Sequence, residues 1–250
     1  MIHLDKISKS FGDQKVLNEL ELHVPTGKIT VIIGRSGEGK SVLMKHLIGL
    51  MHPDTGQVVV DGDDLAALDE VSMNEVRKKY GMLFQYAALF DSLLVKDNIA
   101  FPLKEHTDMT PDQIDERVRE LIHQVGLKDI VLNKYPSELS GGMRKRVGLA
   151  RAIALKPKIL LYDEPTTGLD PIMTDVIDHL ILNTQKKLGI TSVVISHDIR
   201  AVFAIADKIA MLHEGKIILE GTPDEFRNTN IEVVKRFLEG KASEEQLMGS

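Results

Sequence analysis

A glycine-rich loop is the first part of this sequence whose residue types and spacing point to chemistry. Residues 34–41 read Gly-Arg-Ser-Gly-Glu-Gly-Lys-Ser and match the pattern Gly-x-x-x-x-Gly-Lys-Ser/Thr. An apolar run typical of a buried strand precedes them and a helical pattern follows, which is the context that the pattern requires. Glycines let backbone N–H groups point inward at phosphate oxygens, and the N-terminus of the following helix favours an anion. The pattern therefore predicts a nucleotide site made of Gly34, Arg35, Ser36, Gly37, Glu38, Gly39, Lys40 and Ser41.

Two side chains of this loop have defined tasks. The Lys40 amine is expected to reach the β- and γ-phosphates, and the Ser41 hydroxyl is expected to bind Mg²⁺. GTPases and kinases share the same pattern, so it predicts nucleotide binding and leaves the type of nucleotide machine open.

Two neighbouring carboxylates follow a second apolar run. Residues 159–162 are Ile-Leu-Leu-Tyr, as in a strand buried on both faces, and Asp163 and Glu164 come next. Ligands of open parallel sheets bind at the carboxyl ends of the strands. We therefore expect Asp163 to hold Mg²⁺ through water and Glu164 to polarise the attacking water, with the metal offsetting their mutual repulsion. A solvated Asp-Glu pair at a strand end is the structural alternative.

A histidine and a glutamine are weaker candidates when each is taken alone. His197 follows the strand pattern at residues 191–195, and its place at the carboxyl end of a strand favours a contact with the γ-phosphate. Gln85 follows Met82, Leu83 and Phe84. A single His or Gln in such a place is more often structural, so both depend on the stronger motifs around them.

The elements that must position these residues follow from hydrophobic spacing. Short strand patterns at residues 29–33, 57–60, 159–162, 191–195, 209–212 and 217–219 alternate with helical patterns, of which residues 42–50 are the first. This alternation predicts a mainly parallel α/β sheet. Residues 1–33 alternate short apolar strand patterns with turns. We expect one domain over residues 1–250.

Residues 86–157 have a different character and predict an inserted helical subdomain. Thr110 is placed as an N-cap, with Pro111 in the first turn and Gln113 completing a capping box. Gly126 is the expected stop of this helix. A second helix is expected from Ser140 through Ile153, opened by the residues Leu-Ser-Gly-Gly-Met at 139–143. A terminal amphipathic helix and tail, about residues 231–250, is expected to cap the sheet, with bracing of a partner as the alternative.

Composition narrows the class of protein. The net charge of −6 argues against a general nucleic-acid binder. The sequence contains no cysteine, which rules out a disulfide framework and fits a reducing compartment. The first residues lack the pattern of a signal peptide, and no apolar run approaches the roughly 20 residues that span a bilayer. Any membrane contact is therefore expected to pass through a partner protein.

Taken in order, these motifs resemble those of ABC transporter ATPases over essentially the whole chain. On this resemblance residues 34–41 are the Walker A motif, Gln85 is the Q-loop, residues 139–143 are the signature, residues 159–164 are the Walker B motif, Gly168-Leu169-Asp170 is the D-loop and His197 is the switch histidine. Phe11 resembles the aromatic residue that stacks on adenine, with core packing as the alternative.

The resemblance also implies a fold and a mechanism. The fold would be a P-loop ATPase with a mainly parallel core, an N-terminal antiparallel β subdomain and an inserted helical subdomain. Two copies would sandwich two ATP molecules, so that Ser140, Gly141 and Gly142 meet the γ-phosphate of the other copy at a helix N-terminus that favours an anion. Asp170 would couple the two sites. Catalysis would use Glu164, His197 and Gln85, and Ser41, Gln85 and Asp163 would bind Mg²⁺.

Two positions depart from the family pattern. Met143 replaces the usual glutamine of the signature, which removes one side-chain hydrogen bond but leaves Ser140 and the backbone amides. Val42, which we also place at the nucleotide site, stands where a threonine is common after Ser41, and this removes a possible α-phosphate contact. Because neither change touches Lys40 or Glu164, we expect an active ATPase.

Three segments resemble one group within the family, the ATPases of MCE-type (Mla-like) phospholipid transporters. They are residues 84–93, 98–103 and 139–146. The resemblance implies a separate membrane permease, which would dock near residues 85–94, an MCE-domain substrate-binding protein, and a peripheral place on the cytoplasmic face of the bacterial inner membrane. The alternatives are the ATPase of an amino-acid importer or lipoprotein-release system and, more distantly, a soluble ABC ATPase that acts outside transport.

Overall fold

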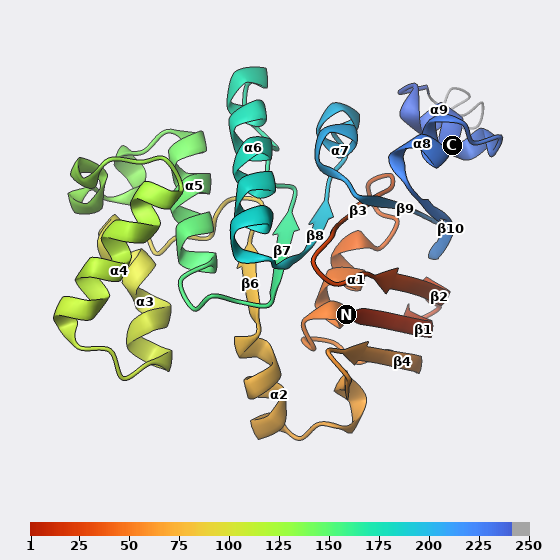
Figure 1. Cartoon of the computed structure of the whole chain (residues 1–250). Helices are drawn as coiled ribbons and strands as arrows, with labels where there is room; N and C mark the ends of the chain where they lie inside the picture. Colours follow the sequence, from red (N-terminus) through yellow and green to blue (C-terminus); the bar gives the residue numbers. More distant parts are fainter. Residues whose placement is uncertain (242–250) are drawn as a thin grey trace. The chain divides into compact units, whose positions relative to one another are not determined.

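A computed structural model describes residues 1–241 of this 250-residue chain. The part of the predicted tail beyond residue 241 lies outside the described residues. The chain divides into two compact units (Figure 1). The first unit consists of residues 1–68 with the chain from Ile195 onward, and the second consists of residues 69–194.

An antiparallel sheet forms one part of the first unit. Its strand order is β2 (Gln14–Val24), β1 (Ile2–Phe11), β4 (Thr55–Val60) and β5 (Asp63–Asp64). Ile2 and Leu4 of β1 are buried, and His3 between them is exposed. The register then passes from Leu4↔Leu22 to Ile7↔Leu20, with Lys6 at φ 45°. This irregularity holds an extra residue in β1, which returns Ile7 to the buried face. The predicted N-terminal antiparallel subdomain is therefore confirmed.

A second group of strands in this unit is mixed. β3 (Ile29–Ile33) pairs parallel with β9 (Lys208–His213), which pairs antiparallel with β10 (Lys216–Gly221). Every residue of β3 is buried, as its continuous apolar pattern predicts. The helices and turns of this unit are α1 (Lys40–Leu47), η1 (Leu65–Ala67), α7 (Ile199–Ile205), α8 (Pro223–Arg227) and α9 (Glu232–Leu238).

Helix α1 differs slightly from the predicted residues 42–50. It begins at Lys40 because Gly39, at φ 98°, forms the N-cap, and it ends at Leu47. Gly49 lies at φ 65°, a backbone conformation in which the helix does not continue.

The second unit holds the other parallel strands. β6 (Tyr80–Leu83) pairs parallel with β7 (Ile159–Asp163). β8 (Thr191–Ile195) is the neighbour of β7 in the sheet, and the second unit ends within this strand. α2 (Glu70–Lys78) precedes β6, and α6 (Pro171–Leu188) connects β7 to β8. Parallel strands need such a crossover, and a helix usually supplies it.

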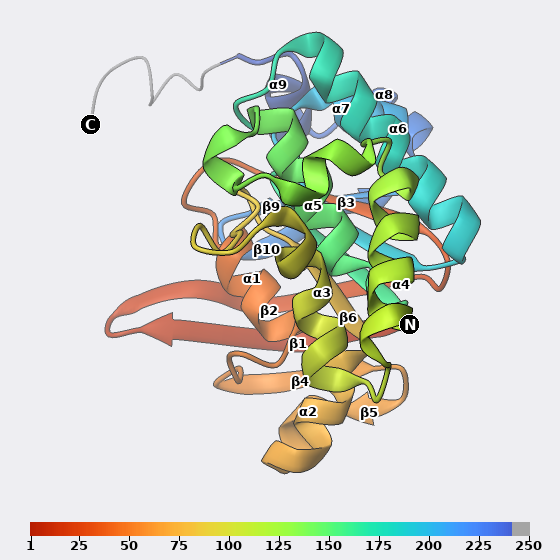
Figure 2. The same cartoon turned by 90° about the vertical axis from the view of Figure 1, so that its left-hand side faces the viewer.

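Between β6 and β7 the chain is helical. The elements are α3 (Val95–His106), α4 (Pro111–Gln124), η2 (Asp129–Asn133), η3 (Pro136–Glu138) and α5 (Gly141–Ala152). Figures 1 and 2 show α3, α4 and α5 side by side. They bury one apolar face each, which includes Ile99, Leu121 and Val147.

Two predicted helix starts are confirmed in detail. Thr110 and Gln113 form a reciprocal capping box at the start of α4. Ser140 is the N-cap of α5, where its Oγ accepts a hydrogen bond from the Met143 N–H at 3.3 Å. These contacts lie within four residues of one another, which is why the local sequence predicts them.

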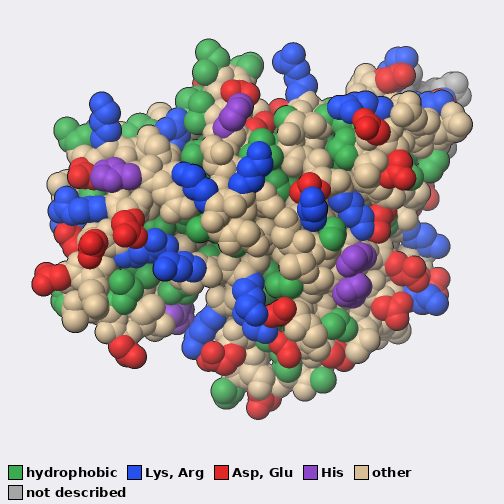
Figure 3. All heavy atoms as spheres, in the orientation of Figure 1, with side chains coloured by type: hydrophobic (Ala, Val, Ile, Leu, Met, Phe, Trp, Pro, Cys, Tyr) green, Lys and Arg blue, Asp and Glu red, His purple; other side chains and the backbone are tan. Residues whose placement is uncertain are grey.

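The distribution of charge and the character of the helices both bear on function. Acidic and basic side chains are interspersed over the face drawn in Figure 3. Among residues 1–241 we find no helix with the length and apolar character that crossing a membrane requires.

Candidate functional site

The phosphate loop lies between β3 and α1 and depends on its glycines. A Cβ atom at Gly34 would lie 2.5 Å from the Leu212 backbone oxygen, so no other residue fits there without a shift of the chain. Gly39 has φ 98°, and a Cβ there would approach Val16 Cγ1 to 2.9 Å. The residue types that the pattern requires are thus the types that this backbone path can hold.

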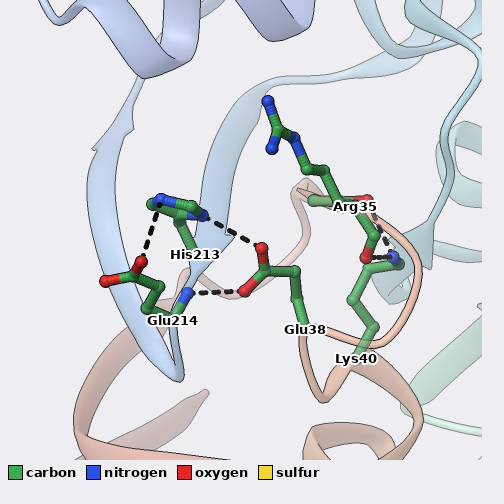
Figure 4. Close-up of polar contacts among 6 residues, drawn as sticks. Arg35, Glu38, Lys40, His213 and Glu214 are labelled. Atoms are coloured by element: carbon green, nitrogen blue, oxygen red, sulfur yellow. Dashed lines mark hydrogen bonds and ion pairs between the residues drawn. The ribbon is translucent and has the colours of Figure 1, made fainter. Parts of the chain in front are cut away.

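Lys40 closes the loop on itself (Figure 4). Its Nζ atom donates hydrogen bonds to the backbone oxygens of Gly34 and Arg35, each at 2.7 Å. The first turn of α1 has no acidic residue, so its N–H groups and the lysine ammonium both favour an anion at this point. The geometry suits the binding of phosphate oxygens.

Glu38 places a carboxylate within the phosphate loop, and its partners are His213, the last residue of β9, and Glu214 in the turn that follows (Figure 4). Its Oε2 accepts a hydrogen bond from the Glu214 N–H at 2.5 Å, and its Oε1 lies 3.0 Å from His213 Nδ1. These contacts direct the negative charge toward the turn. No pattern in the sequence singles out His213 as part of the phosphate loop.

Two further candidates belong to the same unit. Phe11 ends β1 with 47% of its surface exposed, and the Lys9 ammonium lies 5.9 Å from the ring centroid. This exposure disfavours core packing. His197 follows β8 as an exposed residue, next to Asp198, which caps the start of α7.

The acidic pair lies at the end of β7 in the second unit. Asp163 is the last residue of the strand, and Glu164 follows with φ 48°, a left-handed conformation that is uncommon outside glycine. The Thr167 hydroxyl donates to Glu164 Oε2 at 3.1 Å. The backbone and the side chain of Glu164 are therefore both held in place.

Lys145 of α5 joins Glu164 to Gln85 within this unit. Its Nζ atom donates to the Glu164 backbone oxygen at 3.1 Å and also to the Gln85 backbone oxygen. Burial lowers the pKa of Lys145 to about 8, while the carboxylates of Asp163 and Glu164 act in the opposite direction. The sequence places Lys145 in a helix but does not assign it this role.

The predicted signature forms the exposed start of α5. Ser140 is exposed, and the first turn contains no acidic residue. A Cβ atom at Gly142 would come within 2.4 Å of Met173 Cε in α6, so this flexible methionine end would have to move for a larger residue. Asp170 caps α6, accepting hydrogen bonds from the Ile172 and Met173 N–H groups at 3.0 Å each.

The structure thus distributes the predicted residues over the two units. The phosphate loop, Phe11 and His197 belong to the first unit. Gln85, residues 140–142, Asp163, Glu164 and Asp170 belong to the second. Ser41, Gln85 and Asp163 offer a hydroxyl, an amide oxygen and a carboxylate, and hard oxygen donors of this kind fit Mg²⁺.

Comparison with known sequences finds one family. The family described as ABC transporter matches residues 17–167. The intermembrane phospholipid transport system ATP-binding protein MlaF of Haemophilus influenzae is 41% identical over 242 residues, which cover 97% of this chain and 91% of the relative. MlaF of Escherichia coli K12 is 39% identical over 97% of this chain and 90% of its own length. The probable ribonucleotide transport ATP-binding protein mkl of Mycobacterium tuberculosis is 38% identical over 96% of this chain and 67% of its own length.

Solved structures agree with the fold. An ATP-binding cassette in a dimeric post-hydrolysis state with bound ADP and Pi has a TM-score of 0.81 and 29% identity, and the match covers 89% of this chain and 98% of that one. The cbiO1 protein of Clostridium perfringens, part of the ABC transporter complex cbiONQ, has a TM-score of 0.83 and 28% identity, over 94% of this chain and 96% of that one.

Proposed function

This chain belongs to the ABC transporter family, and we propose that it is the ATP-hydrolysing subunit of a phospholipid transporter whose permease is a separate chain. The observation that carries the ATPase function is the phosphate loop, in which Lys40 and the first turn of α1 together favour an anion. The observation that favours phospholipid is the near full-length similarity to two proteins named MlaF.

ATP binding would begin at the phosphate loop. Bound phosphate oxygens would compete with the oxygens of Gly34 and Arg35 for the Lys40 ammonium, because a charged acceptor forms the stronger hydrogen bond. The exposed ring of Phe11 would stack on adenine. Glu38 would stay directed toward His213, so that its charge does not repel the triphosphate.

Hydrolysis would use Glu164 as the general base for the attacking water, with Gln85 and His197 near the γ-phosphate. The contacts of Glu164 with Thr167 and Lys145 support this role, because a base must be held in position before it can act. Mg²⁺, when bound by Ser41, Gln85 and Asp163, supplies positive charge that offsets the charge of the phosphates.

The active form would be a dimer of two copies with shared sites. The start of α5 presents Ser140, Gly141 and Gly142 without an acidic neighbour in the first turn, which suits a γ-phosphate brought by the other copy. Asp170 would connect the two sites. The dimeric cassettes among the similar structures support this arrangement.

An apolar pocket of about 350 Å³ supports docking of a permease. It lies in the second unit, and the exposed rings of Phe84, Phe90 and Phe101 line it. Exposed apolar surface of this kind marks interaction sites. We propose that a helix of the permease occupies the pocket, that an MCE-domain protein completes the complex, and that the chain is peripheral at the cytoplasmic face of the inner membrane.

Reconstitution tests the transported substrate. This chain would be purified with the permease and the MCE-domain protein proposed as its partners, and the complex would be placed in vesicles that hold a fluorescent phospholipid. We expect ATP-dependent movement of the phospholipid, and none with the Glu164→Gln variant. The similarity to the mkl protein makes ribonucleotide transport the second candidate. Uptake of labelled ribonucleotide without lipid movement would favour that function.

A further inference from the structure

We propose that Lys145 is a positioning residue for ATP hydrolysis, which holds the backbone of Glu164 and the backbone of Gln85 in one arrangement. The proposal rests on the role of Glu164 as general base that is proposed above. Lys145, a residue of α5, has no expected contact with the nucleotide. The proposal therefore adds it to the residues that determine the rate of the chemical step.

The contacts of Lys145 carry the first part of the argument. Only 5% of the residue is exposed, and its Nζ atom donates to the backbone oxygens of Gln85 and Glu164. A buried ammonium is costly unless its protons are bonded and its charge is compensated. Here both carbonyls and the nearby Asp163 and Glu164 carboxylates meet these needs. The lysine is thus fixed, and it fixes the groups that it binds.

The backbone of Glu164 needs such support. A residue other than glycine at φ 48° is strained, and the strain persists only where the surroundings determine the conformation. The Glu164 carbonyl accepts from Lys145 Nζ at 3.1 Å and from the Thr167 N–H at 3.3 Å. Because the orientation of this peptide group determines where the Glu164 carboxylate starts, loss of one donor is expected to displace the base.

The segment after Gln85 packs against the same helix. Ala87 has φ 61°, and its backbone oxygen accepts a hydrogen bond from Arg151 Nη2 at 2.9 Å. Gly148 leaves room for Ala87, since a Cβ atom at Gly148 would lie 3.0 Å from Ala87 Cβ. Helix α5 therefore holds this segment at Lys145 and at Arg151. Lys145 also donates to the Glu164 backbone oxygen, so it relates the position of the base to that of Gln85.

Lys145→Met tests the proposal in the purified transporter complex. Methionine keeps the apolar stem and removes the donors. We expect kcat to fall about tenfold or more, since a small misplacement of a catalytic group costs this much. The KM and the dissociation constant for ATP should change little, because the residues expected to bind ATP initially belong to the other unit. Lys145→Arg keeps donors and should recover part of the lost kcat.

Arg146→Met is the matched control. Arg146 is the next residue of α5, and its Nη1 atom also donates to a backbone oxygen, that of Gly126, at 3.3 Å. This bond leads to a loop outside the proposed site, so we expect kcat to stay close to that of the wild type. Thermal unfolding is measured for each variant, together with the fraction of protein that binds a fluorescent ATP analogue. These two measurements show how much of each sample is folded. If Lys145→Met does not fold, Lys145→Gln with its neutral donor replaces it.

Three results would overturn the proposal. One is a kcat for Lys145→Met equal to that of Arg146→Met while Glu164→Gln is inactive. Another is a loss of kcat no larger than the loss of folded, ATP-binding protein. The third is failure of Lys145→Arg to recover any kcat while it folds normally. Wild-type turnover by Glu164→Gln is a different outcome, which contradicts the proposed general base itself.

Discussion

Two lysines, Lys40 and Lys145, donate hydrogen bonds in the same way but have different expected roles. Each donates hydrogen bonds to two backbone oxygens. Lys40 binds oxygens of its own loop, at the point where a phosphate is expected to replace them. Lys145 is buried and binds oxygens of two distant segments, so exchange of its partners would require a change in the packing of α5. We therefore assign binding to the first and positioning to the second.

Lys40→Met should abolish ATP binding. The change removes the charge that the phosphates are expected to meet, whereas the fold keeps the glycines that shape the loop. Binding of a fluorescent ATP analogue measures the effect. Lys45→Met is the control, because Lys45 is an exposed residue of the same helix. Equal ATP affinity of Lys40→Met and Lys45→Met would contradict the assignment of Lys40.

His213→Leu should weaken ATP binding through Glu38. Loss of the imidazole leaves Glu38 Oε1 without this partner, and a less compensated carboxylate in the phosphate loop repels the triphosphate. We expect a loss of about tenfold in affinity, which corresponds to one charge-assisted hydrogen bond. In the double variant with Glu38→Gln the effect of His213→Leu should shrink, because the charge is gone.

Titration calorimetry of the four proteins measures this coupling. His179→Leu is the control, since His179 is an exposed residue of α6 in the other unit. Additive losses in the double variant would show that His213 acts on ATP binding by another route.

At the scale of elements, helix α1 links the phosphate loop to a titratable core residue. His46 is fully buried, and its Nδ1 atom lies 2.7 Å from the Val42 backbone oxygen. Burial lowers the pKa of His46 below its usual value, and the hydrogen bond to Val42 opposes the shift only in part. The folded state therefore favours the neutral imidazole, and acid should loosen the helix that carries Lys40.

This shift gives a pH dependence of stability with a defined sign. Because the folded-state pKa is lowered, the stabilisation is present above the unfolded pKa of about 6.5 and is lost as the pH falls toward the folded value. The free energy of unfolding of the wild type should fall more than that of His46→Gln between about pH 7.5 and pH 5.5. Urea unfolding at both pH values measures the difference. Equal falls for the two proteins would rule out His46 as the source.

Helix α5 is the element on which the second unit of the site depends. Its start carries Ser140 as N-cap, its middle carries Lys145, and its end carries Arg151 against Ala87. One rigid helix thus connects the surface expected to face a second copy with the general base and with the segment beside the permease pocket. A shift of α5 would therefore displace Ser140, the general base and the segment that contains Ala87.

At the scale of the whole molecule, the proposed dimer predicts complementation between inactive variants. Lys40→Ala and Ser140→Ala each damage both shared sites when paired with themselves. A mixed dimer keeps one intact site, made by the phosphate loop of the Ser140→Ala chain and the signature of the Lys40→Ala chain. We expect ATPase activity to return on mixing the two variants, as phosphate release would record.

The mixture of Lys40→Ala with Glu164→Gln is the matched control. Lys40 and Glu164 are expected to serve the same nucleotide from the same chain, so no mixed dimer of these variants has an intact site. Activity in this control, or its absence in the first mixture when dimers are demonstrated by light scattering, would contradict sharing in trans.

Much of the fold could be predicted from the sequence, because its signals are local. The capping box of α4 and the N-cap of α5 depend on residues a few positions apart, and the glycines of the phosphate loop belong to one short sequence pattern. The buried strands β3 and β7 follow from continuous apolar runs. Helix α2 was not predicted: it is mostly polar and buries only Met73 and Val76, so few apolar residues mark it in the sequence.

The sequence by itself determined the family, the order of the motifs and the residues that should meet ATP. Only the tertiary structure decided which side chains support them. Glu38 and His213 are separated by 175 positions, and Lys145 lies 60 positions from Gln85 and 19 from Glu164. Such pairs leave no periodic or local signal, because their contact depends on how strands and helices pack. Packing brings the buried ammonium of Lys145 to two backbone carbonyls. The contacts persist because a buried charge or carbonyl without a partner would destabilise the folded state.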